Sequence, residues 1–158
     1  MSRGVATSYG LPGIPSDDEH AEDEDTWRST CLRFCLSFVQ SIEYHRDQGG
    51  EYPRYPSETV MDGWCDCEDS AILFAALANH LEYDCVFLEF GSDGFLGVGK
   101  WGHVDVGIAA SYDGEFSGTY WTKHGRKYYY VACSARGWDI GDDPGDKYNS
   151  AKIYSLEA

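Results

Sequence analysis

Residues 61–84 read MDGWCDCEDSAILFAALANHLEYD, and this stretch decides the fold. The run that follows Cys67 is apolar on nearly every side, which is typical of a helix buried at the centre of a domain. Asp66 is a residue type preferred at a helix N-cap, and Asp69 three residues later supports the first turn. We therefore expect a central buried helix that begins close to Cys67.

The segments on both sides of this helix predict an α+β fold. Residues 26–47 form a second expected helix, whose apolar side chains at helical spacing should be buried: Trp27, Cys31, Phe34, Cys35, Phe38 and Ile42. Runs typical of strands follow at residues 85–90, 102–111, 118–121, 127–134 and 151–156, separated by turns rich in Gly and Asp. Helices followed by strands, without alternation, predict an antiparallel sheet.

The length and composition are those of one globular domain. The chain has 158 residues, enough for a core without disulfides. Residues 1–25 carry Gly, Pro, Ser and an acidic run, so we expect a poorly ordered leader followed by a domain at 26–158. No apolar stretch is long enough to span a membrane, and the N-terminus lacks the apolar core of a signal peptide. A soluble cytoplasmic protein is the expectation.

The charge of the chain excludes two classes of partner. There are 27 acidic and 12 basic residues, which gives a net charge of −15. Such a surface repels nucleic acid and anionic membranes, so we expect neither as a partner. The acidity continues after Asp25, and only five of the basic residues are lysines, which favours adaptation to a salty cytoplasm; an ordinary acidic protein is the alternative.

Among the six cysteines, Cys67 has the best position for a nucleophile. Backbone N–H groups at a helix start favour a thiolate, whereas the neighbouring carboxylates oppose it, so a cationic partner is needed. His103 is the best candidate, because Val104, Val106 and Ile108 form the core-facing side of its strand. The alternate side, which carries His103 and Asp105, should then be freer to line a cleft.

At this point the residues resemble a known family. The segments FVQSIEYHRD, EYPRYPSETV, CDCEDSAILFAALANHLEYDCVFLEF, GHVDVGIA and GRKYYYVACSARGWDIGDDP are similar, in that order, to the transglutaminase-like domain of archaeal and bacterial proteins. The resemblance covers about residues 35–145. It implies a papain-like core, in which a helix carries a cysteine and an antiparallel sheet carries a histidine and an acid. It also implies acyl transfer through a thioester, as in a peptidase or a transamidating enzyme.

Carried onto this chain, the family's cysteine is Cys67 and its histidine is His103. The third position departs from the pattern, because relatives end the aromatic strand with an acid where this chain has Ala132. Three accounts are open. Asp105 can replace the acid and orient His103, a Cys-His dyad can act alone, or catalysis is lost and a binding module remains.

A zinc site is a lesser alternative. Four residues could together supply the ligands of a closed site: Cys65, Cys67, His103 and Cys133. We otherwise expect no metal and no cofactor, with a protein or peptide as the substrate. The oligomeric state is left open.

Two further features of the expected site remain open. For the oxyanion hole, the Cys67 N–H is the expected first donor, and Gln40 or Trp64 could supply the second. The glycine-rich loop 91–101 is either a flap over the site or a plain connection.

Overall fold

Three helices and seven strands make up the described part of the chain. The computed structural model describes residues 20–48, 50, 52–91, 102–145, 148 and 150–156, with the side chains of 20–22 left out. The helices are α1 (His20–Ser41), α2 (Pro56–Asp62) and α3 (Cys67–His80). The strands are β1 (Glu43–Tyr44), β2 (Trp64–Cys65), β3 (Cys85–Phe90), β4 (His103–Ile108), β5 (Tyr120–Lys123), β6 (Arg126–Val131) and β7 (Lys152–Ser155).

The main sheet is antiparallel throughout, and its order is β5-β6-β4-β3-β7. Strand β4 lies at its centre, where Phe90 of β3 pairs with His103 and Val131 of β6 pairs with Val106. A second sheet consists of the parallel pair β1-β2, which precedes the start of α3. With the helices ahead of the main sheet in sequence, the mixed α/β architecture is compatible with the α+β class expected from the sequence.

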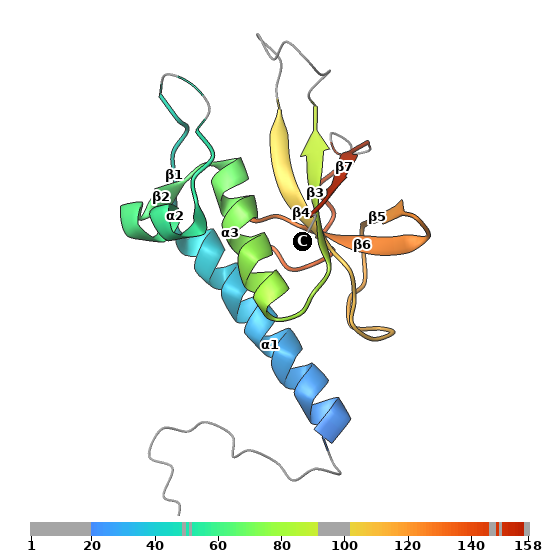
Figure 1. Ribbon diagram of the computed structural model, residues 1–158. Coiled ribbons are helices and arrows are strands. Elements are labelled where there is room, and N and C mark those ends of the chain that lie inside the picture. The colour runs from blue at the N-terminus through green and yellow to red at the C-terminus, as the bar shows by residue number, and fades with distance from the viewer. Residues whose placement is uncertain are drawn as a thin grey trace, which may run out of the picture.

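Helix α3 lies between α1 and the main sheet (Figure 1). One hydrophobic cluster fills this space, with Leu32 from α1, Phe74 from α3 and Ile108 from β4 all fully buried. At its N-terminus α3 has the expected cap, since the Asp66 carboxylate accepts a hydrogen bond from the Asp69 N–H. The apolar sequence of α3 thus reflects its central place, with neighbours on more than one side.

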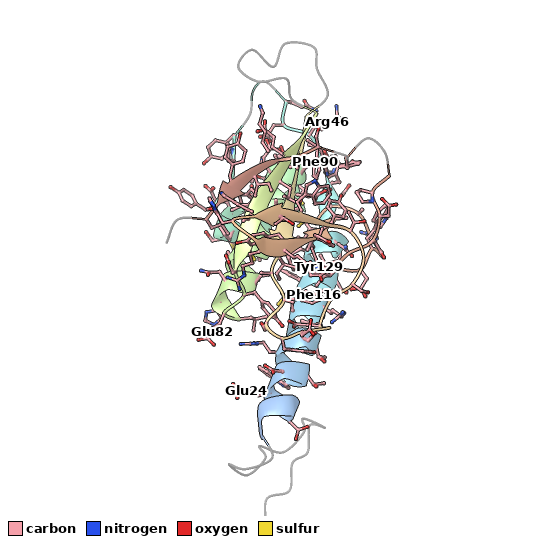
Figure 2. The ribbon with its side chains drawn as sticks, turned by 90° about the vertical axis from the view of Figure 1, so that its right-hand side faces the viewer. Glu24, Arg46, Glu82, Phe90, Phe116 and Tyr129 are labelled. Atoms are coloured by element: carbon pink, nitrogen blue, oxygen red, sulfur yellow. The ribbon has the colours of Figure 1, made fainter. Side chains whose placement is uncertain are left out.

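The opposite face of the main sheet is also covered. A second hydrophobic cluster there includes Leu88, Phe90 and Tyr130, and Tyr148 and Ile153 pack against it. Phe90 of this cluster is labelled in Figure 2. The expectation that the His103 and Asp105 face would be freer to line a cleft is therefore wrong, because aromatic residues of β6, together with Tyr148 and Ile153, cover it.

Helix α1 differs from its prediction in both extent and orientation. It begins at His20, so the residues 20–25 assigned to the leader are helical, and residues 1–19 lie outside the described part. Its buried side consists of Leu32, Leu36 and Val39, whereas Phe34 is 74% exposed. The predicted buried face is therefore wrong: α1 has two apolar sides, and periodicity alone does not say which one meets the core.

Two local elements were absent from the sequence expectations. Helix α2 begins at Pro56, whose fixed backbone angle suits a first helical turn, and ends at Asp62, where Gly63 caps it with a positive φ of 72°. The two-residue strands β1 and β2 are too short to show an alternating pattern. Within the described residues, no helix is both long and apolar enough to cross a membrane.

Candidate functional site

The predicted nucleophile, Cys67, is the first residue of α3 and is buried. Its Sγ lies 3.1 Å from Oε2 of Glu68 and also accepts a backbone hydrogen bond from Val104. The second contact places the sulfur beside the beginning of β4, directly after His103. The chain thus brings the start of the buried helix and the start of the central strand together.

The environment of Cys67 keeps its thiol protonated at rest. Burial, followed by the hydrogen bond to Glu68, raises the pKa of Cys67 to about 12, against the lowering effect of the Val104 N–H. The helix start therefore does not produce a resting thiolate, because desolvation and the adjacent carboxylate outweigh the backbone donors. A base is needed to remove this proton during a reaction.

His103 and Asp105 form a close pair on one face of β4. Nε2 of His103 lies 2.7 Å from Oδ2 of Asp105, and the two residues are separated by one position on the strand. The imidazole and the Tyr148 ring are nearly perpendicular, with the ring centroids 5.7 Å apart. These contacts fix the orientation of the imidazole plane.

Asp105 is a buried carboxylate with several donors. Its side chain is 1% exposed, and it accepts hydrogen bonds from the Tyr130 hydroxyl at 2.6 Å and from the Cys133 N–H at 3.0 Å. Since Val106 pairs with Val131, continuing the same register places Asp105 opposite Ala132. The carboxylate therefore lies on the same face as the position where the family pattern expects an acid.

Three tyrosines join this site without having been predicted. Tyr130 donates to Asp105, and burial followed by the charge of that carboxylate raises its pKa. Burial, followed by the charge that Cys67 would carry, raises the pKa of Tyr44. The pKa of Tyr148 is raised first by burial and then by Asp105 and Cys67. The alternation of the YYY run was the available signal for Tyr130, whereas Tyr44 and Tyr148 reach the site only through the tertiary fold.

The candidates for the second oxyanion donor differ in their surroundings. Gln40 is buried, and its amide nitrogen donates to the carbonyls of Ala132 at 2.9 Å and Trp138 at 3.0 Å. Both of its N–H groups are therefore engaged, which excludes this amide as a ready donor in the described conformation. Trp64 lies under the guanidinium of Arg54, whose Cζ is 3.6 Å from the ring centroid. Residues 92–101 of the expected flap lie outside the described part.

The cysteines do not gather around a metal position. All six are free thiols, and Cys65, Cys85 and Cys133 are buried. Among the described residues, no group of three or more His, Cys, Asp or Glu side chains is placed to hold a metal ion. The zinc set of Cys65, Cys67, His103 and Cys133 is thus not assembled as a site.

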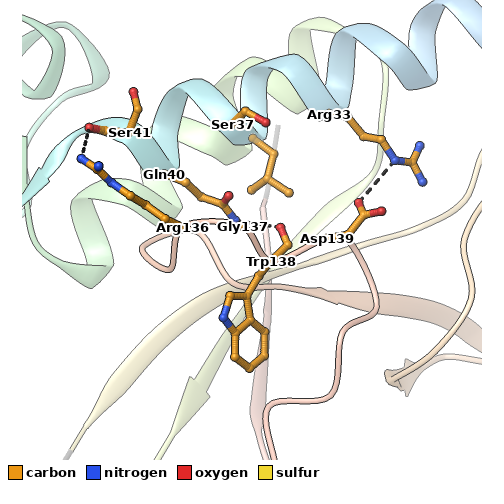
Figure 3. Close-up of a pocket in the computed structure, with 9 residues that line it drawn as sticks. Arg33, Ser37, Gln40, Ser41, Arg136, Gly137, Trp138 and Asp139 are labelled. Carbon is orange, nitrogen blue, oxygen red and sulfur yellow. Dashed lines mark hydrogen bonds and ion pairs between the residues drawn. The ribbon is translucent and has the colours of Figure 1, made fainter.

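A separate groove lies between the C-terminal half of α1 and residues 136–139 (Figure 3). It has a volume of about 430 Å³. Arg33 pairs with Asp139 at one end, and Arg136 donates to the Ser41 carbonyl at the other. The residues that line it do not include Cys67, so the groove is distinct from the cysteine site.

Comparisons with family models, with curated proteins and with solved structures find no match for this chain.

Proposed function

We propose that this protein is a cysteine-dependent acyl-transfer enzyme with a transglutaminase-like, papain-like core. Cys67 is the nucleophile, His103 is the base and then the acid, and Asp105 orients the imidazole. The observation that carries this proposal is the 2.7 Å contact between His103 and a carboxylate located opposite Ala132. The placement of Cys67 at a helix start beside the same strand supports it.

In the proposed reaction, His103 carries a proton from Cys67 to the departing nitrogen of the substrate. Because Nε2 of His103 is engaged by Asp105, Nδ1 is the atom that accepts the Cys67 proton as Sγ bonds to the substrate's carbonyl carbon. The buried carboxylate stabilises the imidazolium that forms. His103 then gives the proton to the departing nitrogen, the C–N bond breaks and a thioester remains. Water or an amine next attacks the thioester carbon and gives a proton to His103. The C–S bond then breaks, and His103 returns that proton to the Cys67 sulfur.

The substrate class follows from this chemistry and from the charge of the chain. A thiol that acts with a histidine acid suits an amide, so a peptide or isopeptide bond of a protein or peptide is the proposed target. The net charge of −15 argues against nucleic acid as a partner.

A binding module on the same fold is the second candidate, and one observation favours it. The thiol of Cys67 is held by Glu68, and its pKa is raised to about 12, the opposite of a preformed thiolate. If His103 does not collect the proton, Cys67 is inert at neutral pH and the surrounding surface serves only to bind.

An activated ester distinguishes the two candidates. Incubation with p-nitrophenyl acetate at pH 7.5 should acetylate Cys67 through a thioester, which mass spectrometry of peptides locates. Cys67→Ala and His103→Ala should each abolish the burst of nitrophenol. Cys65→Ala is the matched control, because Cys65 is buried two residues away, and it should leave the burst unchanged.

Acetylation that is absent, or equal at Cys65 and Cys67, would exclude the enzyme and favour the binding module. If the thioester forms, adding an amine then tests transfer against hydrolysis.

A further inference from the structure

Helix α1 has an exposed apolar stripe on the side away from the core. Trp27 is 56% exposed, Phe34 is 74% exposed and Phe38 is 41% exposed, and Cys31 lies between them on the same side. Leu32, on the opposite side, is fully buried. The helix therefore carries one apolar side for its own domain and a second one that the domain does not cover.

The spacing of this stripe is that of a seam between two helices. Trp27, Cys31, Phe34 and Phe38 follow one another at intervals of four, three and four residues. This is the a/d spacing of a coiled coil, in which a second helix packs along the stripe. The N-terminal half of α1 extends beyond the sheet and the other helices, with Glu24 near its far end (Figures 1 and 2). A second helix can therefore lie along it.

We propose that the second helix is α1 of another copy of this chain, packed antiparallel to form a dimer. In this arrangement Trp27 faces Phe38 of the second copy, and Cys31 faces its Phe34. The three aromatic side chains expose roughly 350 Å² per copy, if each offers about 200 Å² in full. Two copies thus provide the apolar centre of a standard interface, and the polar residues that flank the stripe complete it.

Charge complementarity selects the antiparallel orientation. Asp23 and Glu24 are exposed at the start of α1, and among the described residues neither makes an ion pair. At the other end Arg136 is exposed and donates to the Ser41 carbonyl (Figure 3). Asp23 and Ser41 lie on the same side of the helix, because 18 residues make five turns. An antiparallel pair brings Asp23 near Arg136 of the second copy, whereas a parallel pair opposes like charges.

Analytical ultracentrifugation of the full chain tests the proposal. At about 1 M salt the Debye length is about 3 Å, so the charge of −15 on each copy no longer opposes association. A dimer is expected, and Phe34→Asp should weaken it about 100-fold, as for a central interface residue. Met61→Asp is the control, because Met61 is 85% exposed on α2, and it should leave the dimer intact.

Two results of this experiment would overturn the proposal. One is a wild-type chain that stays monomeric at every concentration, which would leave residues 1–19 or another protein to cover the stripe. The other is a dimer that Phe34→Asp does not weaken. Circular dichroism checks that the variant folds, as expected for so exposed a position.

Charge reversal tests the orientation. At about 0.15 M salt, Asp23→Arg and Arg136→Asp should each weaken the dimer about 10-fold, since each affects two symmetric contacts. The double variant should regain most of the loss, because the reversed pair attracts again. Losses that simply add would overturn the antiparallel arrangement.

Discussion

Asp69 and Asp105 are both almost fully buried, but they are neutralised in different ways. Asp69 accepts hydrogen bonds from Nη1 of Arg54 at 2.6 Å and from the Arg54 N–H at 2.8 Å. Asp105 instead meets the neutral donors Tyr130 and Cys133 together with the ring of His103. One carboxylate has a permanent positive partner, whereas the other has a partner whose charge depends on a proton.

In the proposed mechanism, this difference separates a structural acid, Asp69, from a functional one, Asp105. A buried carboxylate paired with Arg stabilises a fixed arrangement, because Arg keeps its proton. A buried carboxylate paired with His is stabilised further when the ring becomes positive, which is the state that the proposed acyl transfer would form. The same residue type therefore fixes the start of α3 at Asp69, whereas at Asp105 it would stabilise a protonated His103 in the proposed reaction.

Removing the permanent charge should give the largest loss of stability. Arg54→Leu leaves Asp69 buried without its partner, so the free energy of unfolding should fall by about 3 kcal/mol. Arg126→Leu is the matched control, because Arg126 pairs with Asp84 at the same 2.6 Å distance but on the surface. It should cost at most about 1 kcal/mol. Urea denaturation measures both, and equal losses would remove the distinction between the two kinds of pair.

Replacing each aspartate by asparagine tests how much stability depends on its negative charge. Asp69→Asn weakens a buried ion pair and should cost about 2 kcal/mol. Asp105→Asn should change the free energy of unfolding by less than about 1 kcal/mol, because an amide can still accept from the Cys133 N–H and donate to Tyr130. Urea denaturation at pH 7 provides the test. A larger loss for Asp105→Asn would mean that its charge is structural.

Tyr130→Phe removes one neutral donor from Asp105. Its hydroxyl is buried at 2.6 Å from the carboxylate, so the variant should lose about 1.5 kcal/mol of stability. Tyr128→Phe is the control, since its hydroxyl bonds the partly exposed Asp84 at 3.0 Å on the same strand. The control should lose less than half as much in the same assay. The reverse order would contradict the buried network.

Alkaline pH should lower the stability that the Asp105 cluster contributes. Burial followed by Asp105 raises the pKa of both Tyr130 and Cys133 above their ordinary values of 10.0 and 9.0. A raised pKa means that the folded state holds its proton longer, so this contribution is complete below about pH 9 and is lost above it. Ionisation of Cys133 in the unfolded chain should lower the free energy of unfolding by about 1 kcal/mol by pH 10. A flat urea midpoint between pH 8 and 10 would contradict this.

Much of the fold was readable from the sequence because its signals are local. The cap at Asp66 and the apolar run behind it give the start and burial of α3, and strand β3 lies at the expected residues 85–90. Helix α1 shows the limit. Phe34 and Leu32 are both apolar, and only tertiary packing decides that Leu32 enters the core. Chain periodicity cannot make that choice.

The site was readable in part for the same reason. Cys67, His103 and Asp105 were predicted as site residues by local pattern and by resemblance, and the observed proximity of the last two follows from strand alternation. The contribution of Tyr148 depends on a segment far along the chain that returns over the sheet. The hydrogen bond from Gln40 to the Ala132 carbonyl likewise depends on how α1 packs. Such contacts cannot be predicted from the spacing of residues in the sequence.

The proposed mechanism requires Asp105 to replace an acid at position 132, where this chain has Ala132. The direct test is the rate of Cys67 acetylation by p-nitrophenyl acetate in Asp105→Ala and in the double variant Asp105→Ala with Ala132→Glu. Asp105→Ala should lower the rate on the order of 1000-fold, since the imidazolium loses its carboxylate. The double variant should recover much of it, because the new carboxylate projects from the facing strand position. An Asp105→Ala variant that acetylates as fast as the original protein would contradict the claim.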